Sequence, residues 1–187
     1  MKIIEKAIEV ATQAHDQQLR KCSGIPYVSH PLMVGIILMK AGCKEELVAA
    51  GILHDVVEDT EWTLDEIREE FGEQIADIVK GCSEPDKSLS WEDRKQHTIE
   101  FLKDAPLEVK LVAGADKLHN SLSILEEQRV LGERVWEAFK RGREKQAWYY
   151  QGLVDSLCQG LSDQEKKLFI FEDLRHTVTQ LFGEKPA

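Results

Sequence analysis

Apolar residues repeat at intervals of three and four residues along almost the whole chain. Such spacing places them on one face of an α-helix, which can then pack against a core. The first of these stripes consists of Ile3, Ile4, Ala7, Ile8, Ala11 and Ala14. No stretch of useful length alternates apolar and polar residues as a half-buried strand does. The sequence therefore predicts an all-α fold, a bundle of about 9–10 helices.

Helix start and stop signals divide this pattern into segments. Ser29 is an N-cap candidate, Pro31 suits a first helical turn, and Gly42 ends the same helix. Thr63 and Glu66 match a capping box. Helices are expected over residues 2–18, 29–42, 45–58, 63–71, 73–82, 90–104, 106–127, 130–140, 142–160 and 163–182, with a loop over 19–29.

The length of 187 residues is enough for one domain with a real core. We expect residues 1–160 to form this domain and residues 161–187 to add a C-terminal helix that packs on it. The formal net charge is −10, with 34 acidic residues against 24 Lys and Arg. A general nucleic-acid or anionic-membrane binder needs a basic face, so we expect neither as a partner.

The four cysteines, Cys22, Cys43, Cys82 and Cys158, show no spacing typical of a metal site. Cysteines of this kind are typical of reduced thiols in the cytosol. No apolar stretch approaches the roughly 18–20 residues of a membrane span. We therefore expect a soluble, cytoplasmic protein, and the oligomeric state stays open.

One group of polar residues lies on the predicted helix 45–58, next to a very apolar face. His54 and Asp55 are adjacent, and Glu58 and Asp59 follow one turn later. Carboxylates placed this close together repel each other unless a cation or protons intervene. Nitrogen and carboxylate ligands together suit Mn²⁺, Fe²⁺ or Zn²⁺ better than Ca²⁺. A metal ion here would lower the pKa of bound water and neutralise phosphoryl charge, as hydrolysis of a phosphate ester requires.

Taken alone, a His-Asp dipeptide is weak support, because it occurs by chance in many chains and acidic helices are often solvated faces. Three segments in order strengthen the interpretation: YVSHP at 27–31, LHDVVEDT at 53–60 and ADKLHN at 115–120. Arg20-Lys21 precedes them, followed by Gly24-Ile25-Pro26-Tyr27. With these motifs the chain resembles an HD-superfamily phosphohydrolase, and within it the hydrolase domain of the RelA/SpoT guanosine polyphosphate enzymes, over roughly residues 1–155.

The resemblance implies an HD-domain helical bundle with a divalent metal site. Its ligands would be His30, His54, Asp55 and Asp116, and Mn²⁺ is the expected ion, with Zn²⁺, Fe²⁺ or Ni²⁺ as alternatives. The implied reaction is removal of pyrophosphate from the 3′ position of (p)ppGpp. Because no synthetase domain follows, we expect no alarmone synthesis from this chain.

Catalytic and substrate-binding residues follow from the same motifs. Glu58 and Asp59 would orient or deprotonate the attacking water. The residues expected to contact the nucleotide are Arg20, Lys21, Lys117, Asn120 and Tyr150, the Arg through its planar guanidinium. For Tyr150 a purely structural place in the core is an equal alternative. Arg94-Lys95 also falls where related small hydrolases carry an Arg-Lys pair.

One residue departs from the family pattern and leaves the substrate open. Ala113 stands three residues before Asp116, where related (p)ppGpp hydrolases often carry Lys. The partner is expected to be a small phosphorylated nucleotide. The alternatives are another phosphorylated nucleotide or cofactor, such as NADPH or a nucleoside monophosphate, and a non-catalytic domain that binds metal and nucleotide for regulation.

Overall fold

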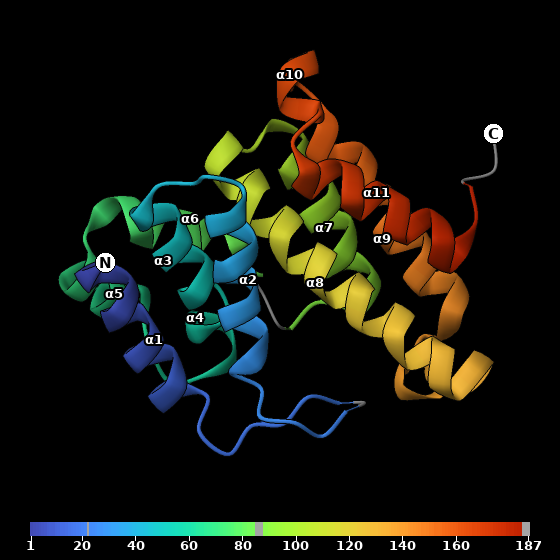
Figure 1. The fold of residues 1–187 in the computed structure, drawn as a ribbon, viewed down its shortest axis with the longest axis horizontal. Helices are drawn as coiled ribbons and strands as arrows, with labels where there is room; N and C mark the ends of the chain where they lie inside the picture. The colour runs from blue at the N-terminus through green and yellow to red at the C-terminus, as the bar shows by residue number, and fades with distance from the viewer. Residues whose placement is uncertain (22, 85–87, 185–187) are drawn as a thin grey trace.

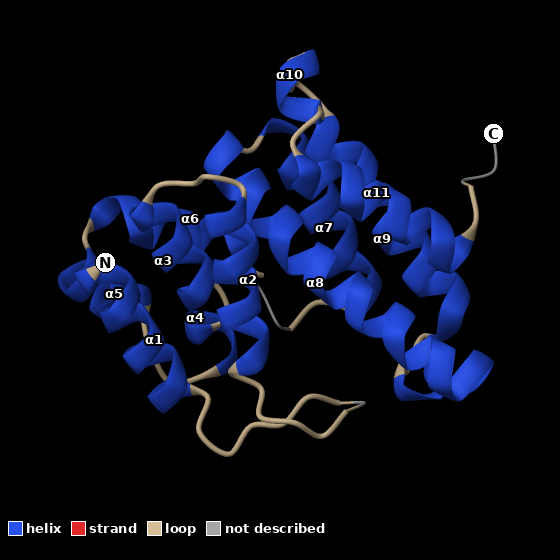
Figure 2. Cartoon of the chain, in the orientation of Figure 1, coloured by secondary structure: helices blue, strands red, loops and turns tan. Residues whose placement is uncertain are grey.

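The computed structural model describes residues 1–21, 23–84 and 88–184. Helices and loops make up these residues, and no strand occurs among them (Figure 2). The elements are α1 (Lys2–Ala14), α2 (Ser29–Lys40), α3 (Glu45–Leu53), α4 (Val56–Asp59), α5 (Leu64–Phe71), α6 (Glu73–Cys82), α7 (Trp91–Asp104), α8 (Leu107–Leu131), the 3₁₀ helix η1 (Gly132–Ala138), α9 (Gly142–Cys158), α10 (Asp163–Lys166) and α11 (Phe169–Phe182). The predicted all-α fold is confirmed.

The longest helix, α8, has 25 residues and runs through the middle of the molecule (Figure 1). It packs against α2, α3 and α6 from the N-terminal half of the chain and against α9, α11 and η1 from the C-terminal half. Ten of its residues are buried, including Asp116. A side chain on α8 can therefore meet groups from both halves of the chain.

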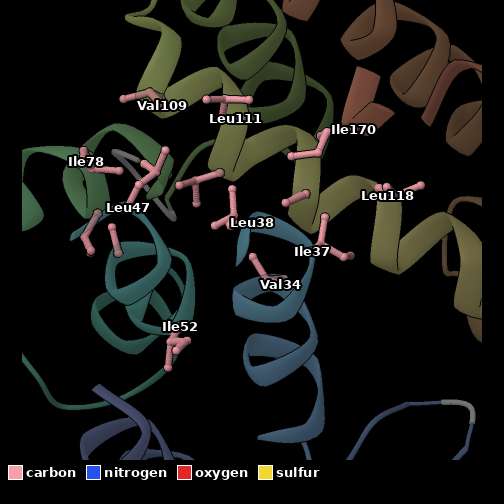
Figure 3. Packing of buried hydrophobic residues seen from close by; sticks show 14 of the residues in the cluster. Val34, Ile37, Leu38, Leu47, Ile52, Ile78, Val109, Leu111, Leu118 and Ile170 are labelled. Carbon is pink, nitrogen blue, oxygen red and sulfur yellow. The ribbon is translucent and has the colours of Figure 1, made fainter. Parts of the chain in front are cut away.

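The core lies where α2, α3, α6, α8 and α11 meet. Figure 3 shows Val34 and Leu38 of α2 facing the side chains of α8, with Ile170 of α11 on the other side of α8. Two glycines allow α2 and α3 to approach closely. A Cβ at Gly51 would lie 2.2 Å from Leu38 Cδ1, and one at Gly35 would lie 2.6 Å from Ile52 Cγ1. This contact fixes α2 and α3, which carry His30 and lead into His54.

The prediction of one continuous helix over 45–58 is wrong. α3 ends at Leu53, His54 and Asp55 form a turn, and α4 begins at Val56. The imidazole of His54 takes part in this break, because its Nδ1 lies 2.7 Å from the carbonyl oxygen of Gly51. It thus satisfies one of the carbonyl groups that a helix leaves free at its C-terminal end.

Other helix boundaries also differ from the prediction. The first helix ends at Ala14 rather than 18, since the chain turns at Gln17 with φ 61°. The helix predicted over 130–140 is the 3₁₀ helix η1, because α8 continues to Leu131. The helix predicted over 163–182 is divided into α10 and α11.

The C-terminal helix α11 packs on α8 and α9. The domain boundary expected at residue 160 stays a prediction, and residues 185–187 of the expected C-terminal segment lie outside the described residues. Within the described part of the chain, no helix is both long and apolar enough to cross a membrane.

Candidate active site

Three side chains from different helices converge in the interior. His30 begins α2, His54 follows α3, and Asp116 lies in the middle of α8. One potential ligand atom from each lies within 4.8 Å of the other two, close enough for a single metal ion. Asp55 adjoins the group, with its Oδ2 3.0 Å from His54 Nε2 and 3.5 Å from His30 Nε2. The four predicted metal ligands are therefore neighbours in space.

The state of His54 supports a cation at this position. The side chain is 3% exposed, and its Nδ1 contacts the Gly51 carbonyl, so Nε2 is the nitrogen available to a ligand. Asp55 Oδ2 lies 3.0 Å from this buried Nε2, yet no acceptor among the described residues meets it in hydrogen-bond geometry. Burial alone would lower the pKa of His54, but the negative charges of Asp55 and Asp116 raise it to about 9. The surrounding charges thus favour a positive charge here, which a proton or a metal ion can supply.

His30 is held from its other side by a second histidine. Its Nε2 lies 3.1 Å from Asp116 Oδ1, while its Nδ1 lies 2.7 Å from His119 Nδ1. Burial and the neighbouring His30 lower the pKa of His119 to about 4. Histidines that bind metals commonly have their second nitrogen held in this way. His119 therefore lies where it can orient His30 without binding the metal itself.

Two further contacts hold the carboxylates. The hydroxyl of Tyr27 donates to Asp55 Oδ2 at 2.6 Å, and the side-chain amide of Asn120 donates to Asp116 Oδ1 at 2.5 Å. Burial alone would raise the pKa of both acids. The pKa of Asp116 nevertheless lies well below its usual range because of Lys117, whose Nζ is 2.7 Å away, and that of Asp55 is lowered by His54. Both carboxylates are therefore ionised and able to bind a cation.

Glu58 and Asp59 do not share one environment. Glu58 lines a central cavity of about 90 Å³ together with His54, Asp55 and Asp116. Burial raises the pKa of Glu58, and its Oε2 accepts a hydrogen bond from the backbone N–H of Glu84 at 3.1 Å. Asp59 is exposed, and it lines neither this cavity nor the two larger cavities that adjoin it. Its backbone carbonyl accepts a hydrogen bond from Gln18 Nε2 at 3.0 Å. Glu58 and Asp59 are adjacent on α4, about 100° apart around its axis, so Glu58 can face the cavity while Asp59 faces solvent.

A second cavity, of about 330 Å³, opens beside the central one and is rich in basic and aromatic side chains. All five predicted substrate-binding residues line it: Arg20, Lys21, Lys117, Asn120 and Tyr150. The Arg20 guanidinium lies 3.1 Å from Asn120 Oδ1 and 5.9 Å from the centre of the Tyr27 ring. The loop that carries Arg20 is closed by a bridge between Leu19 and Pro26.

The sequence interpretation did not select Tyr149, although this residue lines both cavities. Its ring lies beneath two amines, with Lys95 Nζ 4.9 Å and Lys117 Nζ 5.9 Å from its centre. Lys95 also lines both cavities, and the sequence interpretation noted it only as part of an Arg-Lys pair. Tyr149 and Tyr150 are adjacent on α9 and both are buried. Helical spacing alone therefore does not show which of the two tyrosines has the functional role.

A third, largely apolar cavity of about 680 Å³ adjoins the central cavity and shares no lining residue with the basic aromatic one. The two share Glu58, Gly81, Cys82, Glu84 and Thr98. The centre of the site thus lies between a basic aromatic cavity and an apolar one.

The fold and the site define a class of protein: an all-α domain with a buried cluster of His and Asp that suits a divalent cation. A sequence model of the family described as "HD domain" matches residues 7–139, which is more than half of the chain. The chain belongs to the HD domain family, and the predicted family is confirmed.

Named relatives share this family. The guanosine-3′,5′-bis(diphosphate) 3′-pyrophosphohydrolase MESH1 of Danio rerio is 36% identical over 121 residues, which are 63% of this chain and 67% of that protein. The chain spans only a small part of the long bacterial relatives. It covers 14% of a GTP pyrophosphokinase from Streptomyces coelicolor, at 39% identity over 63% of this chain.

Two solved structures are similar along most of the chain. The crystal structure of lmo0812 from Listeria monocytogenes EGD-e superposes with a TM-score of 0.79 and 44% identity, covering 83% of this chain and 99% of that one. A metazoan ortholog of SpoT that hydrolyses ppGpp superposes with a TM-score of 0.79 and 26% identity over 98% of both chains.

Proposed function

We propose that this protein is a metal-dependent phosphohydrolase that removes the 3′-pyrophosphate of guanosine-3′,5′-bis(diphosphate). The observation that carries the proposal is the group of His30, His54 and Asp116, whose ligand atoms lie within 4.8 Å of one another. His54 and Asp116 of this group line the same cavity as Glu58. The basic aromatic cavity beside this group suits a phosphorylated nucleotide. Relatives named for ppGpp hydrolysis support the choice of substrate.

In this proposal His30, His54, Asp55 and Asp116 hold the metal ion. Mn²⁺ suits their mixed nitrogen and oxygen donors, and Zn²⁺, Fe²⁺ or Ni²⁺ are alternatives. When bound, such an ion lowers the pKa of a water ligand and neutralises phosphoryl charge. Tyr27 and Asn120 hold the two carboxylates in place through their hydrogen bonds.

Glu58 is the proposed proton acceptor for the attacking water. It lines the central cavity, and its raised pKa brings it closer to the range in which a carboxylate accepts a proton effectively. Asp59 is exposed in the structure and stays a predicted second partner for that water.

The nucleotide is proposed to bind in the basic aromatic cavity. The planar guanidinium of Arg20 suits stacking on the base, and Lys21, Asn120 and Tyr150 line the same space. The phosphates then pass Lys95, Lys117 and Tyr149, which line both cavities. This path leads the 3′-phosphates to the metal ligands.

A less charged substrate is the second candidate, and one residue favours it. Ala113 lines the central cavity, so the Lys often found there in related hydrolases is missing from the place where phosphates would lie. NADPH or a nucleoside monophosphate carries fewer negative charges near the reacting phosphate and depends less on that cation.

The cellular compartment is also a proposal. Cys43, Cys82 and Cys158 are free thiols among the described residues, and Cys22 lies outside them. Free thiols support a reducing compartment such as the cytoplasm.

The test uses the purified full chain loaded with Mn²⁺ and a panel of ppGpp, NADPH and nucleoside monophosphates. Release of pyrophosphate from ppGpp is expected. Asp55→Ala should lose both metal and activity, whereas Glu58→Gln should keep the metal and lose turnover by about 10²–10⁴-fold. Glu46→Gln, an exposed acid on α3, is the matched control and should behave as wild type.

Three results would change the proposal. Wild-type turnover by Glu58→Gln would remove the assigned proton acceptor. Cleavage of NADPH or a monophosphate but not ppGpp would select the second candidate. If no phosphate ester is cleaved with any divalent metal, a regulatory domain that binds metal and nucleotide becomes the better description.

A further inference from the structure

Glu84 follows α6 and makes two ion pairs at the wall of the central cavity. Its Oε2 lies 2.6 Å from Arg94 Nη1, and its Oε1 pairs with Lys95 Nζ. The Glu84 side chain is only 9% exposed. Burial alone would raise the pKa of Glu84, but the positive charges of Lys95 and Arg94 lower it. Glu84 is therefore ionised at neutral pH and balances one of the two positive charges.

Lys95 is one of the cations that a substrate phosphate would meet first. It lines the central cavity with Glu58 and Asp116, and it also lines the basic aromatic cavity. Arg94, the other cation paired with Glu84, lines none of the three cavities, and its buried Nε has no acceptor among the described residues. Lys95 is therefore the cation of this pair that a phosphate in the cavity can contact.

The other amine at the central cavity is also paired with an acid of the protein. Lys117 Nζ lies 2.7 Å from Asp116 Oδ2. Position 113 in the same wall is alanine. Substrate phosphates must therefore compete with Glu84 and Asp116 for the amines that line this cavity, and Asp116 is a proposed metal ligand.

Glu84 also contacts the proposed proton acceptor. Its backbone N–H donates to Glu58 Oε2 at 3.1 Å. The side chain of Glu84 thus binds the two cations, while its backbone N–H binds Glu58. Replacement of the carboxylate by an amide changes the first interaction and leaves the backbone donor in place.

We propose that Glu84 is a specificity-determining residue, whose carboxylate competes with substrate phosphates for Lys95. Because repulsion grows with the charge of the ligand, Glu84 disfavours highly charged phosphates more than weakly charged ones. This inference rests on the proposed function, since it concerns the phosphates bound at the same site. It sets how strongly the site discriminates between a pyrophosphate group and a single phosphate.

The test measures binding of inorganic pyrophosphate and inorganic phosphate to the full chain by isothermal titration calorimetry, with one equivalent of Mn²⁺ and no free metal. Glu84→Gln should bind pyrophosphate roughly tenfold more tightly and phosphate only about threefold more tightly. The dependence of pyrophosphate affinity on salt should become steeper, because more uncompensated positive charge faces the ligand. Glu100→Gln, which removes the acid of an exposed ion pair with Lys103 on α7, is the matched control and should change neither affinity more than twofold.

Unchanged or weaker pyrophosphate binding by folded Glu84→Gln would overturn the inference, as would an equal gain for both ligands. If Glu84→Gln does not fold, Lys95→Met serves as the second variant. It should weaken pyrophosphate binding roughly tenfold or more, and unchanged binding would also overturn the inference. The hydrolysis assay is separate: failure to cleave ppGpp rejects the proposed function, whereas failure of the binding test with cleavage intact rejects only the role of Glu84.

Discussion

The Nδ1 atoms of His30 and His119 lie 2.7 Å apart, and the two rings stack with their centres 4.9 Å apart. One of these nitrogens must donate a proton and the other must accept it. Since Nε2 of His30 is turned toward Asp116, a metal at that nitrogen requires the proton on Nδ1. His119 is then the acceptor, and its lowered pKa of about 4 keeps it neutral for this task.

His119→Ala is therefore expected to weaken Mn²⁺ binding by about 10–100-fold, because the acceptor that orients His30 is lost. Titration calorimetry of the metal-free protein measures this directly. His119→Gln, which retains an acceptor, should recover part of the affinity. The control is His176→Ala, which removes an exposed histidine of α11. Wild-type affinity in a correctly folded His119→Ala variant would contradict this assignment.

The metal should also stabilise the fold, since the ionised carboxylates of half-buried Asp55 and buried Asp116 repel each other without a cation. Mn²⁺ at about 100 times its Kd contributes about 2.7 kcal/mol. For a chain of this length that corresponds to a rise in Tm of roughly 5–10 °C, which differential scanning calorimetry can measure. Asp116→Ala should show no such rise, and an equal rise in that variant would place the stabilising ion elsewhere.

Arg20→Lys tests the planar group at the nucleotide cavity. The guanidinium contacts Asn120 Oδ1 and lies over Tyr27, and a lysine ammonium cannot reproduce this geometry. We expect KM for the nucleotide to rise about tenfold with little change in kcat, since the lost contacts hold the substrate rather than the reacting phosphate. Arg129→Lys, the same change at an exposed position of α8, should leave steady-state kinetics unaltered. A fall in kcat alone would argue against a binding role.

Gly51→Ala tests the close contact between α2 and α3. The new Cβ would lie 2.2 Å from Leu38 Cδ1 and 3.3 Å from Val34 Cγ1, so side chains must shift. A loss of about 1–3 kcal/mol in the free energy of unfolding is expected from overpacking, measured by urea denaturation. The double variant Gly51→Ala/Leu38→Ala should lose less than the sum of the single variants, because Leu38 is the clashing partner. Strict additivity would show that the steric conflict is relieved elsewhere.

The sequence determined the fold class and most helices, because apolar spacing and caps are local properties of the chain. The capping box of Thr63 and Glu66 forms as expected, with both hydrogen bonds present. The order of the three motifs was also enough to predict the family. His30, His54, Asp55 and Asp116 could be selected from these motifs, although the first and the last lie 86 positions apart in the sequence.

Only the tertiary structure decided how those residues are arranged. The helix break at His54 depends on an imidazole that bonds to a backbone carbonyl, a choice that helical periodicity does not express. Glu58 and Asp59 follow this break as neighbours on α4, and the packing of that helix turns Glu58 toward the central cavity and leaves Asp59 exposed. The contact between His30 and His119 joins segments that are far apart in the chain. The ion pair between Glu84 and Lys95 joins residues on either side of a loop. Periodicity predicts which face of a helix is buried, but which side chains then meet depends on how the helices pack against one another.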